Sequence, residues 1–134
     1  AKSDTKRGPL GRTPLCWSIL RGNETTSKLL IARGADLEMT DSRTRGAPLS
    51  WAAVQGSDEV VKLLLEKGAG IDSRDRDGNT ALWLAASYGK YAIVKLLLDN
   101  GAQVELKNRH GQTPLFIAEK KGHKDVVEIL QRSR

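Results

Sequence analysis

The chain has 134 residues, which is the size of one domain. Hydrophobic residues make up 39 % and aromatic residues 4 %, so the core must be built from Leu, Ala, Ile and Val, and no apolar run reaches the roughly 18 residues of a membrane span. The net charge of +6 permits acidic partners, but the first twelve residues supply half of it and the rest of the chain mixes both signs, which favours a solvated surface.

Cysteine usage bears on the compartment. The lone Cys16 excludes an internal disulfide, and no secretory leader is visible at Ala1. We therefore expect an intracellular location in the cytoplasm, with the nucleus as the alternative.

One pattern recurs four times. Its anchor residue is Thr13, Ala47, Thr80 and Thr113, at spacings of 34, 33 and 33 residues. A period in this range indicates a solenoid, whose short units bury their apolar faces against their neighbours. Such an array offers a long surface and no enclosed pocket, so the period predicts a binding scaffold and not an enzyme.

The first two units cover approximately residues 7–40 and 41–74. Unit one contains Gly11-Arg12-Thr13-Pro14-Leu15, then Leu29-Leu30-Ile31, then Gly34-Ala35. Unit two contains Ala47-Pro48-Leu49-Ser50-Trp51-Ala52-Ala53, then an apolar run at 60–65, then Gly68-Ala69. The prolines suit the first turn of a helix, where the missing N–H costs nothing. The loop at 41–46 has one residue more than its counterpart in unit three, so we expect a longer or distorted finger.

Unit three, approximately residues 75–107, shows the plan most clearly. Asp77-Gly78-Asn79 predicts a turn, and Thr80 suits the N-cap of a first helix at 81–88. Gly89 ends that helix, and the apolar spacing predicts a second helix at about 91–100.

Unit four, approximately residues 108–134, repeats the plan with Gly111-Gln112-Thr113-Pro114-Leu115 and an apolar run at 126–130. Polar residues replace apolar ones at Thr26 and Ser27 in unit one and at Glu119 and Gln131 in unit four. Because the outer units of an array face water on one side, these changes predict that residues 1–134 form a single domain with capped ends. The alternative is a slice from a longer array.

The units resemble ankyrin repeats, whose signature of Gly-x-Thr-Pro-Leu-x-x-Ala, Leu-Leu-Leu and Gly-Ala recurs from about residue 7 to residue 132. The wording of unit two is similar to that of ankyrin arrays in fungal multidomain proteins. The resemblance implies an all-α solenoid of stacked helix-turn-helix units with projecting β-hairpin fingers and a concave face. It also implies recognition of another protein by a monomer, without catalysis or a cofactor.

The first helices carry a second stripe opposite their Leu/Ala face, because positions i, i+3 and i+4 share one side of a helix. By the resemblance, this stripe lines the concave groove. Its candidate partner-binding residues are Trp17, Leu20, Arg21, Trp51, Val54, Gln55, Ser87, Tyr88, Lys120 and Lys121. Trp17 and Trp51 hold the same position in adjacent units and would form an aromatic ledge of the kind that dominates interfaces. The alternative is that both pack between neighbouring helices.

The fingers form the rim of the groove. Their candidate partner-binding residues are Arg43, Arg45, Arg74, Arg76, Asp77, Asn79, Lys107, Arg109 and His110. The cations could pair with an acidic patch on a partner protein. The alternative is a solvated rim, since exposed ion pairs contribute only about 0–1 kcal/mol and Asp41 and Asp75 dilute the positive charge.

The sequence gives little support for catalysis or metal binding. One Cys and two distant His residues predict neither a catalytic group nor a metal site. Two non-catalytic alternatives stay open. The basic and aromatic concave face could bind single-stranded nucleic acid or another polyanion, although the chain lacks an unbroken basic stripe. The domain could also be a structural spacer within a larger protein.

Overall fold

The computed structural model describes residues 12–40, 42–55 and 57–134. The basic segment before Arg12, Gly11 of the first unit and Asp41 of the second finger lie outside the described residues. Within these ranges, eight helices follow one another in four pairs. They are α1 (Pro14–Leu20), α2 (Glu24–Ala32), α3 (Pro48–Gln55), α4 (Asp58–Glu66), α5 (Ala81–Ser87), α6 (Tyr91–Asp99), α7 (Pro114–Lys121) and α8 (Lys124–Arg132).

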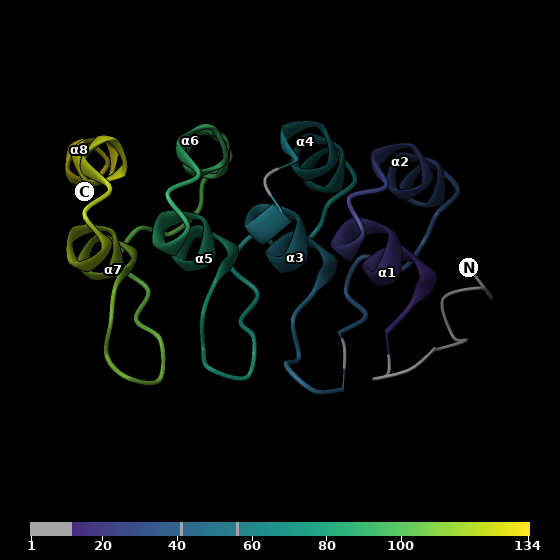
Figure 1. Ribbon diagram of the computed structural model, residues 1–134, viewed down its shortest axis with the longest axis horizontal. Helices are drawn as coiled ribbons and strands as arrows, with labels where there is room; N and C mark the ends of the chain where they lie inside the picture. Colours follow the sequence, from purple (N-terminus) through teal and green to yellow (C-terminus); the bar gives the residue numbers. More distant parts are fainter. Residues whose placement is uncertain (1–11, 41, 56) are drawn as a thin grey trace.

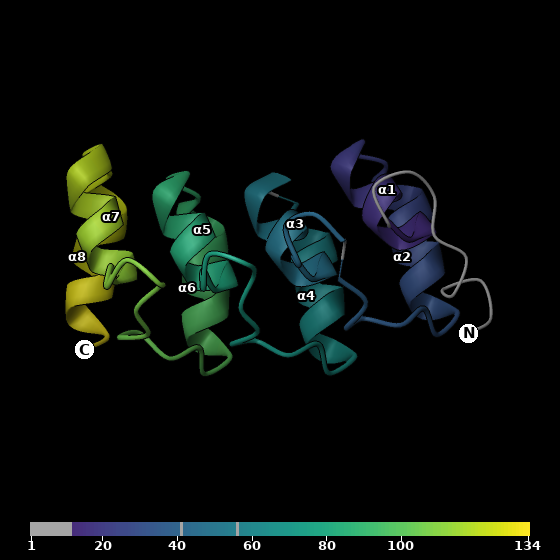
Figure 2. The ribbon, with the colours of Figure 1, turned by 90° about the horizontal axis from the view of Figure 1, so that it is seen from below.

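The pairs stand side by side in a row. The first helices α1, α3, α5 and α7 form one layer and the second helices α2, α4, α6 and α8 form another (Figure 1). The loops between pairs, which we call the fingers, project from the first-helix layer on the side away from the second helices. Seen from that side, the row advances steadily from the N-terminal to the C-terminal pair (Figure 2). The all-α solenoid expected from the repeat is therefore confirmed.

Threonine caps start most of the first helices. The Oγ1 atoms of Thr13, Thr80 and Thr113 each accept a hydrogen bond from the backbone N–H three residues later, at 3.3, 3.2 and 3.1 Å. Unit two lacks this cap because Ala47 has no hydroxyl, and the N–H of Ser50 bonds to the backbone oxygen of Ala47 at 3.0 Å. The helix still begins at Pro48, whose fixed φ suits its first turn.

Small side chains set the spacing of the first helices. Ala52, Ala53, Ala85, Ala86 and Ala118 are all fully buried. Alanine lets neighbouring backbones approach, so the first helices contact one another more extensively than the second helices do. The second helices contribute fully buried leucines, Leu64, Leu97 and Leu130, to the same core. A row that is tighter on one side curves toward that side, which places the first helices and fingers on the inner face.

The fingers differ from the expected β-hairpins, because no strand is assigned anywhere in the described part of the chain. The two ends of fingers three and four are joined by a backbone bond, from Asp75 N–H to the oxygen of Asn79 and from Asn108 N–H to that of Gln112, at 3.0 and 2.9 Å. A turn bond of 2.9 Å lies inside each, from Gly78 N–H to the Asp75 oxygen and from Gly111 N–H to the Asn108 oxygen. The next backbone donor turns to the preceding finger instead. The N–H of Arg76 bonds to the Thr44 oxygen at 2.7 Å, so no ladder develops.

Finger two is distorted, as its length predicts. Its turn spans 42–44, against 76–77 in finger three. Arg45 stands where fingers three and four have Gly78 and Gly111, and all three adopt positive φ, at 58°, 78° and 75°. A side chain with a Cβ is strained in this region, so finger two holds its shape at an energetic cost.

The polar residues of the end units fall into two groups. Thr26, Glu119 and Gln131 are exposed, as caps require. Ser27 is fully buried, so its expected contact with water is wrong. Its hydroxyl lies 2.7 Å from the Ser18 hydroxyl, so the buried polar group has a polar partner inside the unit.

Candidate functional site

The groove stripe is only partly open to solvent. Arg21, Gln55, Tyr88, Lys120 and Lys121 are exposed. Trp17, Leu20, Trp51 and Val54 are half-buried. Ser87 is only 8 % exposed, and the turn between α7 and α8 of the next unit packs beside it, with the His123 ring Nε2 at 3.0 Å from the Ser87 backbone oxygen. The side chain of Ser87 therefore does not contribute to the surface of the groove.

An arginine joins the two tryptophans. The guanidinium carbon of Arg12 lies 5.0 Å from the Trp17 ring centroid and 5.6 Å from that of Trp51. Arg21 approaches Trp17 at 5.3 Å. Such cation–π contacts contribute about 0.5–2 kcal/mol, depending on solvent exposure. The ledge is thus an alternation of cations and rings. Arg12 was not among the residues predicted from the sequence, although it directly precedes the Thr13 cap of α1.

Trp51 and Trp83 each carry a donor without a partner. Among the described residues, their Nε1 atoms are the buried side-chain polar atoms that make no hydrogen bond. Both rings pack against the core, as the packing alternative for Trp51 requires. Trp51 also lines a surface pocket, so packing and exposure to the groove hold together for this residue.

That pocket lies where the inner faces of α3 and α5 meet fingers two and three. Its volume is about 190 Å³. The lining residues are Thr44, Gly46, Ser50, Trp51, Val54, Asp75, Asp77, Asn79, Leu84 and Tyr88. It is called the groove pocket below. Trp51, Val54 and Leu84 come from the helices and Tyr88 caps the end of α5, while both carboxylates come from finger three.

Asp75 is the structural centre of finger three. Its Oδ1 accepts hydrogen bonds from the backbone N–H groups of Asp77 and Asn79, at 2.9 and 3.0 Å. Burial raises the pKa of Asp75 above its ordinary value of 3.8, while these two backbone bonds act in the opposite direction. The charge of Asp77 adds to the rise. A partly desolvated carboxylate thus faces the pocket.

The finger cations have two different roles. Arg43, Arg45, Arg74, Lys107 and His110 are exposed along the rim. Arg76 and Arg109 bind the preceding fingers as well. Arg76 Nε donates to the Arg43 oxygen at 2.9 Å, and Arg109 N–H donates to the Asp77 oxygen at 2.9 Å. These two arginines therefore hold the row of fingers together while their side chains stay exposed.

Asn79 does not belong to the exposed rim. It is 8 % exposed, and its Oδ1 accepts a hydrogen bond of 3.0 Å from the Asn108 Nδ2. The Asn108 Oδ1 in turn accepts from the His110 and Gln112 N–H groups, which repeats the arrangement around Asp75. The side chain of Asn79 thus positions fingers three and four relative to each other.

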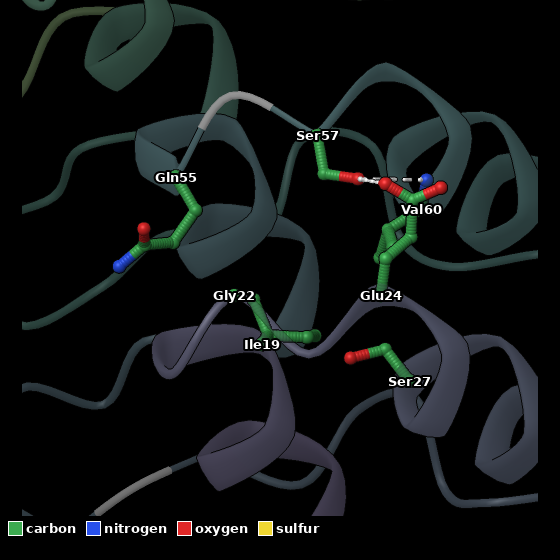
Figure 3. A pocket seen from close by; sticks show the side chains of 7 residues that line it. All are labelled: Ile19, Gly22, Glu24, Ser27, Gln55, Ser57 and Val60. Atoms are coloured by element: carbon green, nitrogen blue, oxygen red, sulfur yellow. Dashed lines mark hydrogen bonds between the residues drawn. The ribbon is translucent and has the colours of Figure 1, made fainter.

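A second pocket, of about 250 Å³, lies between the helix-joining turns of units one and two (Figure 3). In it, the Ser57 hydroxyl donates to Glu24 Oε2 at 3.2 Å. The corresponding residue of unit four is His123, whose ring fills the space beside Gly89. The pocket therefore exists because serine is smaller than histidine. Its size is below the roughly 300–1,000 Å³ of typical small-molecule sites.

The described residues contain no group of three metal-ligating side chains, and none of their helices has the length and apolarity that a bilayer crossing demands.

Comparison with known proteins places the chain. A family model described as "Ankyrin repeats (3 copies)" matches residues 1–75 and 49–133, so the two matches together span nearly the whole chain. A search of curated proteins finds no match. Ankyrin repeats are generally protein–protein interaction modules. The matched segments and the four stacked helix pairs agree, and the chain belongs to the ankyrin-repeat family.

Proposed function

We propose that the chain is a non-catalytic module that binds another protein in the groove between its first helices and fingers. The observation that carries the proposal is the exposed aromatic surface beside the groove pocket. Tyr88 is 55 % exposed, and its neighbour Trp51 forms another wall of the same pocket. Tyrosine and tryptophan bury a large area at low entropy cost, so they are typical anchors of protein interfaces.

The mechanism is preorganisation. The groove is built from helices with fully buried alanines, and its fingers are hydrogen-bonded to one another. A surface that is already ordered loses little conformational entropy when a partner binds, so modest contacts give useful affinity. The exposed cations of the rim, such as Arg43 and Lys107, would contact acidic groups of the partner around the groove.

We also propose that residues 1–134 act as one monomeric domain with units one and four as caps. The exposure of Thr26, Glu119 and Gln131 supports this organisation. The buried thiol of Cys16 fits a location inside the cell, in the cytoplasm or the nucleus.

A matched pair of tyrosine variants tests the groove. Tyr88 in the groove and Tyr91 on α6 are both exposed, at 55 % and 41 %, and they lie three residues apart. Proteins captured from a cell lysate by the wild type and by Tyr91→Ala, but not by Tyr88→Ala, would support the groove as the binding site. Equal capture by all three would move the site elsewhere.

Ionic strength separates the remaining alternative. The capture is repeated at two salt concentrations, because polyanion binding falls steeply as salt rises. Recovery of nucleic acid alone, and only at the lower salt, would replace the protein-binding function with polyanion binding. A spacer predicts that no partner depends on Tyr88.

A further inference from the structure

The groove pocket exists because one side chain is missing from a repeated position. Asn79 at the foot of finger three bonds to Asn108 of finger four at 3.0 Å. One unit earlier, the same two positions are Gly46 and Asp75. Gly46 has no side chain to meet the carboxylate, so the space between fingers two and three is open.

Only one of the two carboxylate oxygens of Asp75 accepts hydrogen bonds from described residues. Its hydrogen bonds to described residues all end on Oδ1, at 2.9 and 3.0 Å. In Asn108, the atom that corresponds to Oδ2 is the amide nitrogen, and it bonds to Asn79 and to Gln112. The Oδ2 atom of Asp75 makes no such cross-finger bond, and Asp75 lines the open pocket. A negatively charged acceptor is therefore available at this point of the groove.

The remaining walls are also suited to a cation. The rings of Trp51 and Tyr88 line the pocket, and aromatic faces attract positive charge, although the Arg12 guanidinium already lies 5.6 Å from the Trp51 ring centroid. Asp77 adds a second carboxylate, although Arg109 Nη1 lies 4.0 Å from its Oδ1 and offsets part of its charge. The nearby Arg76 guanidinium is held by backbone oxygens of finger two, at 2.9 and 3.3 Å. The net electrostatic preference inside the pocket is thus for a cation, in contrast to the basic rim.

Size and geometry select the kind of cation. At about 190 Å³ the pocket is smaller than a typical small-molecule site of roughly 300–1,000 Å³, which points to a single side chain. One oxygen of Asp75 is occupied by backbone donors, so a guanidinium could not bind both oxygens of the carboxylate. An ammonium needs only one oxygen and a surrounding of partial negative charge.

We propose that the groove pocket receives one lysine side chain of the partner protein, with its ammonium bound to Asp75 and its alkyl chain between Trp51 and Tyr88. This inference rests on the proposed function and names the chemistry by which the groove recognises its partner. The acidic pocket would then bind a lysine of the partner, and the basic rim would bind acidic residues that flank this lysine.

The test uses the smallest probe that carries this side chain. Nα-acetyl-L-lysine N-methylamide is titrated into the ¹⁵N-labelled domain, and the norleucine analogue serves as the uncharged control. We expect the lysine probe to shift the Trp51 indole N–H and the amide signals of Asp77 and Asn79. A probe this small should bind with a Kd of about 1–10 mM. The norleucine probe should leave these signals in place.

Two variants probe the pocket itself. Asp75→Asn keeps the turn, because Asn108 forms the same turn in finger four, and it should weaken lysine binding about tenfold or more. Gly46→Asn places in unit two the side chain that unit three has, and it should also block the probe. Its Cβ would lie 3.1 Å from Trp51 Nε1, so a shift of a few tenths of an ångström admits it.

Several results would overturn the inference. They are equal shifts with the norleucine probe, stronger shifts with the matching arginine probe, an unchanged response of Asp75→Asn, and no shift at about 50 mM lysine probe, well above the expected Kd. These failures differ from a failure of the proposed function. If Tyr88→Ala loses its captured partners but the wild type does not bind the lysine probe, the groove remains the binding site and the lysine proposal fails. If Tyr88→Ala captures the same partners as the wild type, the groove is not the binding site, and the lysine proposal fails with it.

Discussion

The hydroxyl oxygens of Ser18 and Ser27 lie 2.7 Å apart inside the first unit, and each also contacts a backbone oxygen of its own helix, at 2.8 and 2.9 Å. Two hydroxyl protons serve three contacts, so one of these three contacts has no proton. The same positions in unit two are Ala52 and Val61, whose side chains have no polar group that needs a hydrogen-bond partner.

We therefore expect the double variant Ser18→Ala/Ser27→Val to be more stable than the wild type by about 1 kcal/mol, since replacing both polar partners removes a desolvation cost. The added methyl groups have space, because Ser27 borders the pocket between units one and two. Urea unfolding of the double variant and both single variants gives the coupling energy. A double variant less stable than the wild type would contradict the prediction.

Ala47→Thr should supply the missing cap of α3. The threonine Oγ1 would accept the Ser50 N–H, as Thr80 accepts the Trp83 N–H at 3.2 Å. A cap of this type contributes about 1 kcal/mol. The equivalent Thr13 and Thr80 are both 2 % exposed, so the fold accommodates threonine at this position. The control is Thr80→Ala, which should lower the free energy of unfolding by a similar amount. Equal stabilities of Ala47→Thr and the wild type would disprove the cap.

Arg45→Gly should stabilise finger two. The residue has a φ of 58°, which glycine adopts without steric cost. Relief of this strain is worth about 1–2 kcal/mol, and the greater freedom of glycine in the unfolded chain offsets about half of it. Thermal unfolding is the measurement. Arg43→Gly, at an exposed rim position that lacks positive φ, is the control and should destabilise.

Asp75→Asn should alter the pH dependence of stability. Because the pKa of Asp75 is raised in the folded state, its protonated form favours folding; its contribution is fully present below 3.8 and is lost as the pH rises through the raised pKa. Asparagine does not titrate. The variant should therefore be more stable than the wild type at neutral pH, and the difference should shrink as the pH falls toward 3.8.

Urea unfolding across this pH range measures that difference. Asp99→Asn, in an exposed pair with Lys95, controls for the change in net charge. A difference that stays constant with pH would show that Asp75 has no such role.

Leu64→Ala and Leu97→Ala test the core. Both side chains are fully buried at the same position of neighbouring units. Each variant should lose about 2–5 kcal/mol in the free energy of unfolding, the usual cost of a leucine cavity. A loss below about 0.5 kcal/mol would be outside that range and would mean that these side chains do not build the core.

The repeat and its helices could be predicted because they depend on local and periodic features. Thr80 as an N-cap, Pro114 in a first turn and the buried Leu97 all follow from residue type and spacing. The signals are strong because each recurs in several units, so that neighbouring units confirm one another.

The candidate binding surface and the packing of the first unit depend on side-chain contacts that residue spacing does not reveal. The place of Arg12 over two rings is set by side-chain packing between units. Ser27 is polar but buried, because its partner Ser18 comes from the other helix of the pair. The groove pocket depends on what Gly46 lacks opposite a residue 29 positions later, Asp75. In a position-by-position alignment of the units, Gly46 is the counterpart of Asn79 and lacks its side chain.

Three consecutive residues of unit two depart from the pattern of unit three: Arg45, Gly46 and Ala47 replace Gly78, Asn79 and Thr80. The first is strained, the second leaves the pocket open, and the third removes a helix cap. The proposed recognition surface thus lies at a joint, between units two and three, that lacks these three residues of the unit-three pattern. A partner that seals this joint would raise the cooperativity of the whole row, because units in a solenoid are coupled only through their neighbours. Binding at one pocket would then slow amide exchange in units that the partner never touches.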